Sequence, residues 1–234
     1  MQKTVLLLTI FFSFSFYSKV SAQLINLPKT GITENEAGLG IKEALGNGVT
    51  RAVGILNKKD GFFGNNLYKI LLPPELLKAE GKLRKLGAGK LFDDAILQIN
   101  RGAEEAVGSA APIFGNAIRE MTMQDALKII QGPDTSVTAY FRSKTDTALT
   151  SAFTPVVRQA LEHTGATRYY NDLINVYNKI PLVKKINPDL SAYVVEKTLF
   201  ALYDQIGKEE KEIRRDPVKR TTNILQKVFG GGSN

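Results

Sequence analysis

FDDAILQINRGAEEAVGSA, residues 92–110, is the stretch that decides the fold. Its apolar residues recur at steps of three or four positions: Phe92, Ala95, Ile99, Ala103, Ala106 and Ala110. Its polar residues Asp94, Gln98, Arg101 and Glu105 fall on another side. This spacing places the apolar side chains along one face of an α-helix. Because most of them are alanine, the stretch predicts a helix that packs closely against its neighbours.

The same spacing recurs on both sides of this helix, together with residues that begin and end helices. Thr33–Glu36 and Thr122–Asp125 have the capping-box pattern, in which a hydroxyl and a carboxylate satisfy the first free amides. Pro112 is expected either to kink the central helix or to begin a new one. The expected helices cover 33–56, 74–85, 92–110, 122–131, a region after 134 that ends near 165, 173–180, 188–215 and 217–229.

The chain is therefore expected to be all-α, a compact irregular bundle of about eight or nine helices with no substantial sheet. Residues 62–72 form the one passage expected to be irregular or extended, and Pro73-Pro74 ends it. We expect residues 33–229 to form a single helical domain, preceded by an extended segment at 23–32 and followed by a disordered tail at 230–234.

The N-terminus has the pattern of an export signal. Lys3 precedes an apolar run, and Val20-Ser21-Ala22 offers the small side chains that a signal peptidase requires. We expect cleavage after Ala22 and a mature protein that is periplasmic or secreted.

Composition limits the chemistry that the chain can perform. It has no cysteine, which excludes thiolate nucleophiles and thiolate metal sites, and it has one histidine, His163. That histidine is expected to cap a helix end. No zinc-binding histidine pair, nucleophile elbow or phosphate loop is present, so we expect no catalytic residue, no metal site and no cofactor.

Charge bears on the partners. The formal net charge of +8 favours anionic partners, although such a balance is also common on ordinary soluble proteins. We expect an unidentified small molecule or an envelope protein as the partner, and no nucleic acid. A peripheral contact with an anionic membrane, through basic groups near Lys58, Lys184 and Arg214, is a further hypothesis.

Asn100, Arg101 and Glu104 are the most informative polar group. Asn100 and Glu104 lie one helical turn apart beside the alanine face, so they are expected to be partly buried and to need polar partners. Two interpretations stay open. The three residues form a buried structural network, or they line a polar site in a cleft between helices.

Tyrosines are concentrated in the second half of the chain, among them Tyr140, Tyr193 and Tyr203. At helical spacing such residues are usually core-edge side chains, and a groove for a carbohydrate or an apolar ligand would use the same side chains.

Several passages together resemble the exported bacterial family catalogued as domain of unknown function 4197. The resemblance covers about residues 39–230. Its motifs are Leu72-Pro73, Asn100-Arg101 with Glu104, Met121-Thr122 with Asp125-Ala126, Tyr140-Phe141-Arg142, Glu209-Glu210, Ile213-Arg214 with Asp216-Pro217, and Val228-Phe229-Gly230. The chain differs from the family pattern at Gly102, where alanine is expected, and at Ala201, where glycine is expected. The resemblance implies an all-helical envelope protein and no established activity.

The leading functional hypothesis is a non-enzymatic binding or interaction module. Its cleft would be edged by Asn100, Arg101, Glu104, Tyr140 and Arg142. The alternatives are an enzyme that acts on a cell-envelope polymer through two converging carboxylates and the peripheral membrane protein described above.

Overall fold

The computed structural model describes residues 33–133, 136–186, 189–216, 222–223 and 225–226. Within these residues the chain is helical and contains no strand, as the sequence predicts. The elements are α1 (Glu34–Leu56), α2 (Pro74–Leu83), η1 (Arg84–Ala88), α3 (Gly89–Val107), α4 (Ala111–Glu120), α5 (Met123–Gln131), α6 (Ser136–His163), α7 (Ala166–Asn178) and α8 (Leu190–Arg215). Because η1 joins α2 to α3 without a gap, the number of separate helices is slightly lower than expected.

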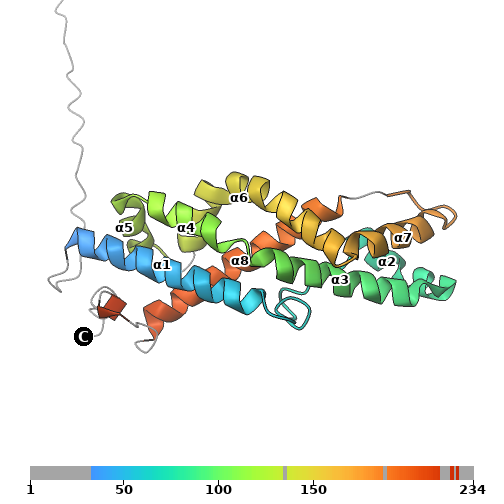
Figure 1. Ribbon diagram of the computed structural model, residues 1–234, viewed down its shortest axis with the longest axis horizontal. Coiled ribbons are helices and arrows are strands. Elements are labelled where there is room, and N and C mark those ends of the chain that lie inside the picture. The colour runs from blue at the N-terminus through green and yellow to red at the C-terminus, as the bar shows by residue number, and fades with distance from the viewer. Residues whose placement is uncertain (1–32, 134–135, 187–188, 217–221, 224, 227–234) are drawn as a thin grey trace, which may run out of the picture.

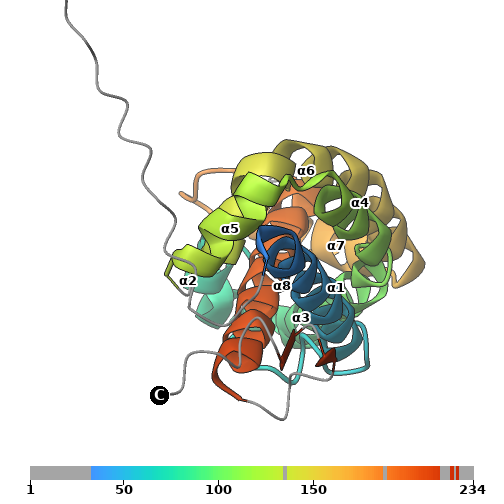
Figure 2. The same cartoon turned by 90° about the vertical axis from the view of Figure 1, so that its left-hand side faces the viewer.

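The long helices run along the long axis of the molecule, and the shorter ones pack around them (Figures 1 and 2). α8 packs against α6, α1 and α3, whereas α3 packs against α7 and α6. α4 and α5 pack against α1 and α6 at one end of the bundle, and α2 and α7 lie at the other. The bundle thus forms around α3 and α8.

The apolar face of α3 is buried as its spacing predicts. Every member of the stripe from Phe92 to Ala110 is at most 1% exposed, although α3 ends at Val107 and Ala110 precedes α4. Gly102 lies on the same helix where α3 meets α6, and a Cβ atom there would lie 2.8 Å from Leu161 Cδ2. The glycine therefore permits a closer approach of the two helices than a larger residue would.

The helix boundaries follow the capping residues. Both capping boxes, Thr33–Glu36 and Thr122–Asp125, are formed. Pro112 lies in the first turn of α4, so it begins a helix and does not kink α3. α2 ends at Leu83, two residues before the expected end, and Gly87 turns the chain toward α3 in a left-handed conformation, with φ of 82°.

α6 is a single helix of 28 residues that contains Pro155. The missing amide of Pro155 leaves the carbonyl of Ser151 without its helical donor. Both residues are exposed, so water can satisfy that carbonyl. The proline therefore does not break the helix.

Some expectations fall outside the described residues: the export signal at 1–22, the segment 23–32, most of the helix expected at 217–229 and the tail at 230–234.

Candidate functional site

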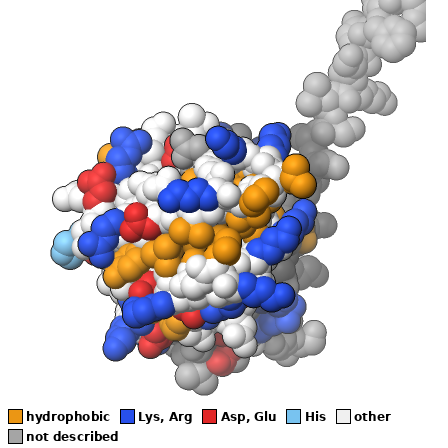
Figure 3. Space-filling model, turned by 90° about the vertical axis from the view of Figure 1, so that its right-hand side faces the viewer, with side chains coloured by type: hydrophobic (Ala, Val, Ile, Leu, Met, Phe, Trp, Pro, Cys, Tyr) orange, Lys and Arg blue, Asp and Glu red, His pale blue; other side chains and the backbone are white. Residues whose placement is uncertain are grey.

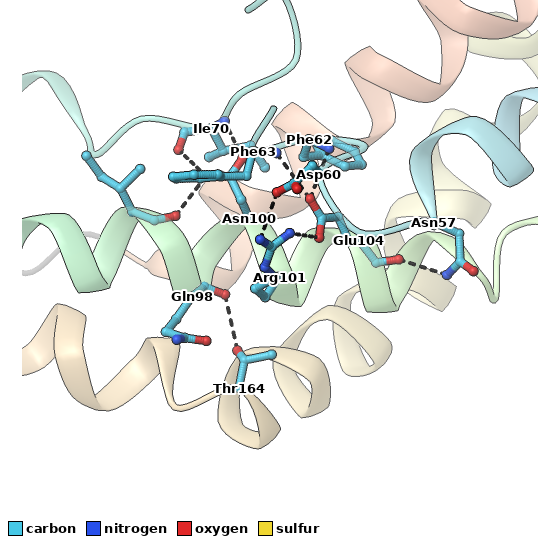
Figure 4. A network of polar contacts seen from close by, with 11 residues as sticks. Asn57, Asp60, Phe62, Phe63, Ile70, Gln98, Asn100, Arg101, Glu104 and Thr164 are labelled. Carbon is cyan, nitrogen blue, oxygen red and sulfur yellow. Dashed lines mark hydrogen bonds and ion pairs between the residues drawn. The ribbon is translucent and has the colours of Figure 1, made fainter. Parts of the chain in front are cut away.

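An irregular loop of residues 57–73 connects α1 to α2 and lies against α3, where Asn100 holds it. The Asn100 side chain is fully buried. Its Oδ1 accepts a hydrogen bond from the Ile70 amide, and its Nδ2 donates to the Ile70 carbonyl and to the Ile96 carbonyl, each at 2.8 Å. All three contacts end on backbone groups (Figure 4). Asn100 thus satisfies both backbone groups of Ile70, as a neighbouring strand would do in a sheet.

Glu104 holds the beginning of the same loop. Its Oε1 accepts hydrogen bonds from the amides of Phe62 and Phe63, both at 3.1 Å, and its Oε2 contacts Arg101 Nη1 at 2.6 Å (Figure 4). The backbone carbonyl of Glu104 accepts from Asn57 Nδ2 at 2.9 Å. A buried carboxylate needs such partners, since desolvation without them is costly.

Arg101 completes the group, which we name the loop clamp: Asn100, Arg101 and Glu104. Its Nη2 contacts Asp60 Oδ1 at 2.8 Å, and its guanidinium lies 5.6 Å from the centre of the Phe63 ring. The hydrogen bond to Glu104 raises the pKa of Arg101, so this side chain stays charged. The clamp residues direct their polar atoms to the loop, to the backbone of α3 and to one another. This geometry favours the structural interpretation of the three residues over a ligand site.

The loop that the clamp holds forms one wall of a groove, which we name the α6–α8 groove. Residues 67–72 of the loop, the start of α2 at Pro74 and Leu77, α6 and the first half of α8 surround a volume of about 1080 Å³. Ile70, fixed by Asn100, lines the groove, as do the partly exposed Leu67, Leu71 and Phe200. The clamp on α3 therefore fixes the loop that forms one wall of the groove.

Polar groups of the groove are mostly engaged. Tyr193 Oη donates to the Leu71 carbonyl at 3.0 Å, and Tyr203 Oη donates to Asp146 Oδ1 at 3.2 Å. Burial raises the pKa of Tyr203 to about 12, so its hydroxyl stays protonated. The groove's other carboxylate, Glu196, pairs with Lys197 at 3.2 Å.

Arg142 is different. Its guanidinium lies 5.6 Å from the centre of the Tyr203 ring in the groove, and it is exposed. Within the part of the chain that the structure describes, it has no hydrogen bond to a side chain and no ion pair. It therefore presents an unneutralised positive charge at the groove.

The five residues expected around one cleft are thus separated. Arg142 lines the groove, and Asn100, Arg101 and Glu104 lie behind its loop wall. Tyr140, although next to Phe141 on the same helix as Arg142, does not line the groove, and partial burial raises its pKa. Sequence reasoning missed Leu71 and Phe200. The available signal was that Phe200 is a large apolar residue outside the apolar stripe of α8, which consists of Ala192, Val195, Leu199, Leu202 and Ile206.

Arg214, which the sequence suggested as part of a basic surface, faces the bundle. It forms an ion pair with Glu210, and its guanidinium donates to the carbonyls of Ile129 and Ile130 at 2.6 and 3.1 Å. These carbonyls lie in the last turn of α5, where the usual helical donors are missing; the Ile129 carbonyl also accepts from the Gly132 amide at 3.3 Å. Arg214 thus joins the end of α5 to α8.

His163 is the last residue of α6, at a helix end as expected. Its side chain contacts a neighbouring helix, and in the ranges that the structure covers it has no hydrogen bond to the carbonyls that it was expected to cap. Its Nδ1 lies 2.9 Å from Glu105 Oε2 on α3, which links the two helices. No group of three or more histidines, cysteines, aspartates or glutamates suited to hold a metal occurs among the described residues. In the same residues, no helix has the length and apolar character needed to cross a membrane.

A family model described as "Protein of unknown function (DUF4197)" matches residues 31–230, nearly the whole chain. The comparison with curated proteins and the comparison with solved structures returned no match.

Replacement of Glu104 tests the loop clamp. Glu104→Ala would leave the Phe62 and Phe63 amides without an acceptor and Arg101 without its closest partner. We expect a loss of about 3 kcal/mol in unfolding free energy. Glu104→Gln keeps one oxygen for the two amides and should lose about 1 kcal/mol. Urea unfolding of both variants measures this, and equal losses would contradict the assigned roles of the two oxygens.

The His163–Glu105 pair predicts a pH effect. The hydrogen bond to Glu105 raises the pKa of His163 above 6.5, so the pair's contribution to stability is complete below pH 6.5 and is lost as the pH rises through the raised value. His163 is the only histidine, so an untagged protein gives one imidazole signal in an NMR titration. We expect Glu105→Gln to return the pKa toward 6.5. A wild-type value at or below 6.5 would refute the pair.

Proposed function

The chain belongs to the DUF4197 family of proteins of unknown function, and we propose that it is a non-enzymatic binding module whose site is the α6–α8 groove. Its ligand is an elongated small molecule with an apolar body and an anionic group. The observation that supports this most is the combination of apolar groove walls with the unneutralised Arg142.

The walls suit an apolar body. Of the six large apolar side chains that are exposed in the described residues, three line this groove: Leu67 at 57%, Leu71 at 44% and Phe200 at 44%. A ligand that covers them would remove apolar surface from water, which is the main favourable term in such binding. The volume of about 1080 Å³ is slightly above the range of about 300 to 1,000 Å³ that is typical of small-molecule sites, so it can hold an elongated ligand.

Arg142 suits the anionic group. A guanidinium offers a planar pair of donors to a carboxylate or a phosphate, and the Tyr203 ring beneath it supports its orientation. The tyrosine hydroxyls of the groove are engaged with the protein, so they hold the walls in place.

Two lysines also line the groove. Lys197 pairs with Glu196, and Lys69 lies 4.1 Å from the centre of the Phe63 ring and is only partly exposed. The exposed Arg142 is therefore the cation that we assign to recognition.

We further propose that the protein works in the periplasm or outside the cell. The support is the pattern of residues 1–22, an apolar run followed by Val20-Ser21-Ala22. Intact-mass measurement of the protein from an exporting host should give a chain that begins at Gln23. A mass that includes Met1 would refute export by this signal.

The binding prediction concerns Arg142. A fluorescent fatty acid analogue, displaced by unlabelled fatty acid, serves as the probe of an apolar anion. We expect Arg142→Gln to weaken its binding at least about tenfold, because one charge-assisted contact is lost. The melting temperature should not change, since Arg142 is exposed.

Arg158→Gln is the matched control, because Arg158 is an exposed arginine of α6 that does not line the groove. It should bind the probe as the wild type does. Asp146→Asn should also retain binding, because Asp146 contacts Tyr203 and repels an anion. Equal affinities for the Arg142 and Arg158 variants, or no binding by the wild type, would contradict the proposal.

A further inference from the structure

Two connections meet at one end of the bundle, away from α4 and α5. The connection between α2 and α3 and the connection between α7 and α8 both lie at this end (Figure 1), where α7 packs against α2 and α3. Viewed onto this end, apolar side chains gather between lysines and arginines (Figure 3). Each connection carries one strongly exposed leucine: Leu86 is 62% exposed, and Leu182 is fully exposed.

The backbone presents both leucines at sharp turns. Leu182 itself has φ of 65°, a left-handed conformation that side-chain-bearing residues rarely adopt. Leu86 immediately precedes Gly87, whose φ is 82°. Strain of this kind at Leu182 persists where the surrounding structure holds it, and it is concentrated at binding sites. Gly87 adopts its conformation without strain and serves only to turn the chain after Leu86. The two turns hold apolar side chains in water instead of directing them to the core.

The lysines around the two leucines lack acidic partners. Five exposed lysines flank the turns: Lys82, Lys85, Lys179, Lys184 and Lys185. None of them forms an ion pair with a carboxylate among the described residues. The neighbouring Arg84, in contrast, contacts Glu80 and Asp93, and Lys90 contacts Asp94. The positive charge of this end therefore comes from the lysines next to the leucines.

We propose that this end, defined by Leu86, Leu182 and the five lysines, docks onto an anionic lipid bilayer. The lysines lie at the level of the headgroups, and the leucines enter the boundary of the acyl chains. A bilayer fits both features, because it offers negative charge and an apolar phase without requiring a complementary pocket. A nucleic acid or an acidic glycan would satisfy the lysines and leave the leucines in water. None of the residues that define this end lines the α6–α8 groove, so each proposal can be contradicted without affecting the other.

Vesicle sedimentation tests the proposal. The exported protein, with its N-terminus set by intact mass, is mixed at low salt with vesicles of phosphatidylcholine containing about one-third phosphatidylglycerol, or with phosphatidylcholine alone. We expect binding to the anionic vesicles only. The pair Lys184→Glu and Lys185→Glu should weaken it at least about tenfold, since each lysine near an anionic surface contributes to binding. The pair Leu86→Ser and Leu182→Ser should weaken it as well, and this loss should persist at raised salt.

Matched controls come from the opposite end of the bundle. Leu39→Ser changes an exposed leucine of α1, and the pair Lys128→Glu and Lys144→Glu changes two exposed lysines of α5 and α6. These variants should bind as the wild type does, and unchanged circular dichroism melting verifies the fold of every variant. The proposal is overturned if the wild type does not sediment with anionic vesicles, if the two sets of variants behave alike, or if replacing both leucines leaves sedimentation with anionic vesicles unchanged.

Discussion

The buried polar contact between α3 and the loop of residues 57–73 is the constraint on which the groove depends. Asn100 holds both backbone groups of Ile70 at 2.8 Å, and Glu104 accepts the amides of Phe62 and Phe63. The loop has no regular secondary structure to satisfy these groups, so the two side chains replace the missing partners. Hydrogen bonds of Tyr68 and Tyr193 tie the same loop to α8, and the two side chains of α3 fix it from the opposite side.

The sequence predicted the helices because the information for them is local. The stripe of α3 and the two capping boxes depend on residues within a few turns of one another. The pattern around Pro112 left two outcomes open, and the structure shows that the proline begins α4. The helix α1 contains several glycines, and the spacing of its apolar residues does not show which of them pack against a neighbour. A Cβ atom at Gly38 would collide with Met123, whereas one at Gly54 would meet no neighbour. Close packing therefore explains only some of the glycines of that helix.

The groove could not be predicted in the same way, because its walls come from distant parts of the chain. Asn100 was recognised as a polar residue beside an apolar face, but its partner Ile70 lies 30 positions earlier in a passage without periodicity. The sequence analysis singled out Arg142 and Tyr203 separately. Only the packing of α6 against α8 brings the two side chains together. A sequence pattern shows which residues face the core, and it does not show which exposed residues will share a hollow.

Amide hydrogen exchange at Ile70 tests the central claim most directly. Its amide donates only to the Asn100 side chain, so its protection in the native protein reports that contact and no helix or sheet. If Asn100 holds the loop, the Ile70 amide should exchange as slowly as the amides in the core of α3. Exchange at the rate of an exposed loop amide would show that Asn100 does not hold the loop that forms one wall of the groove.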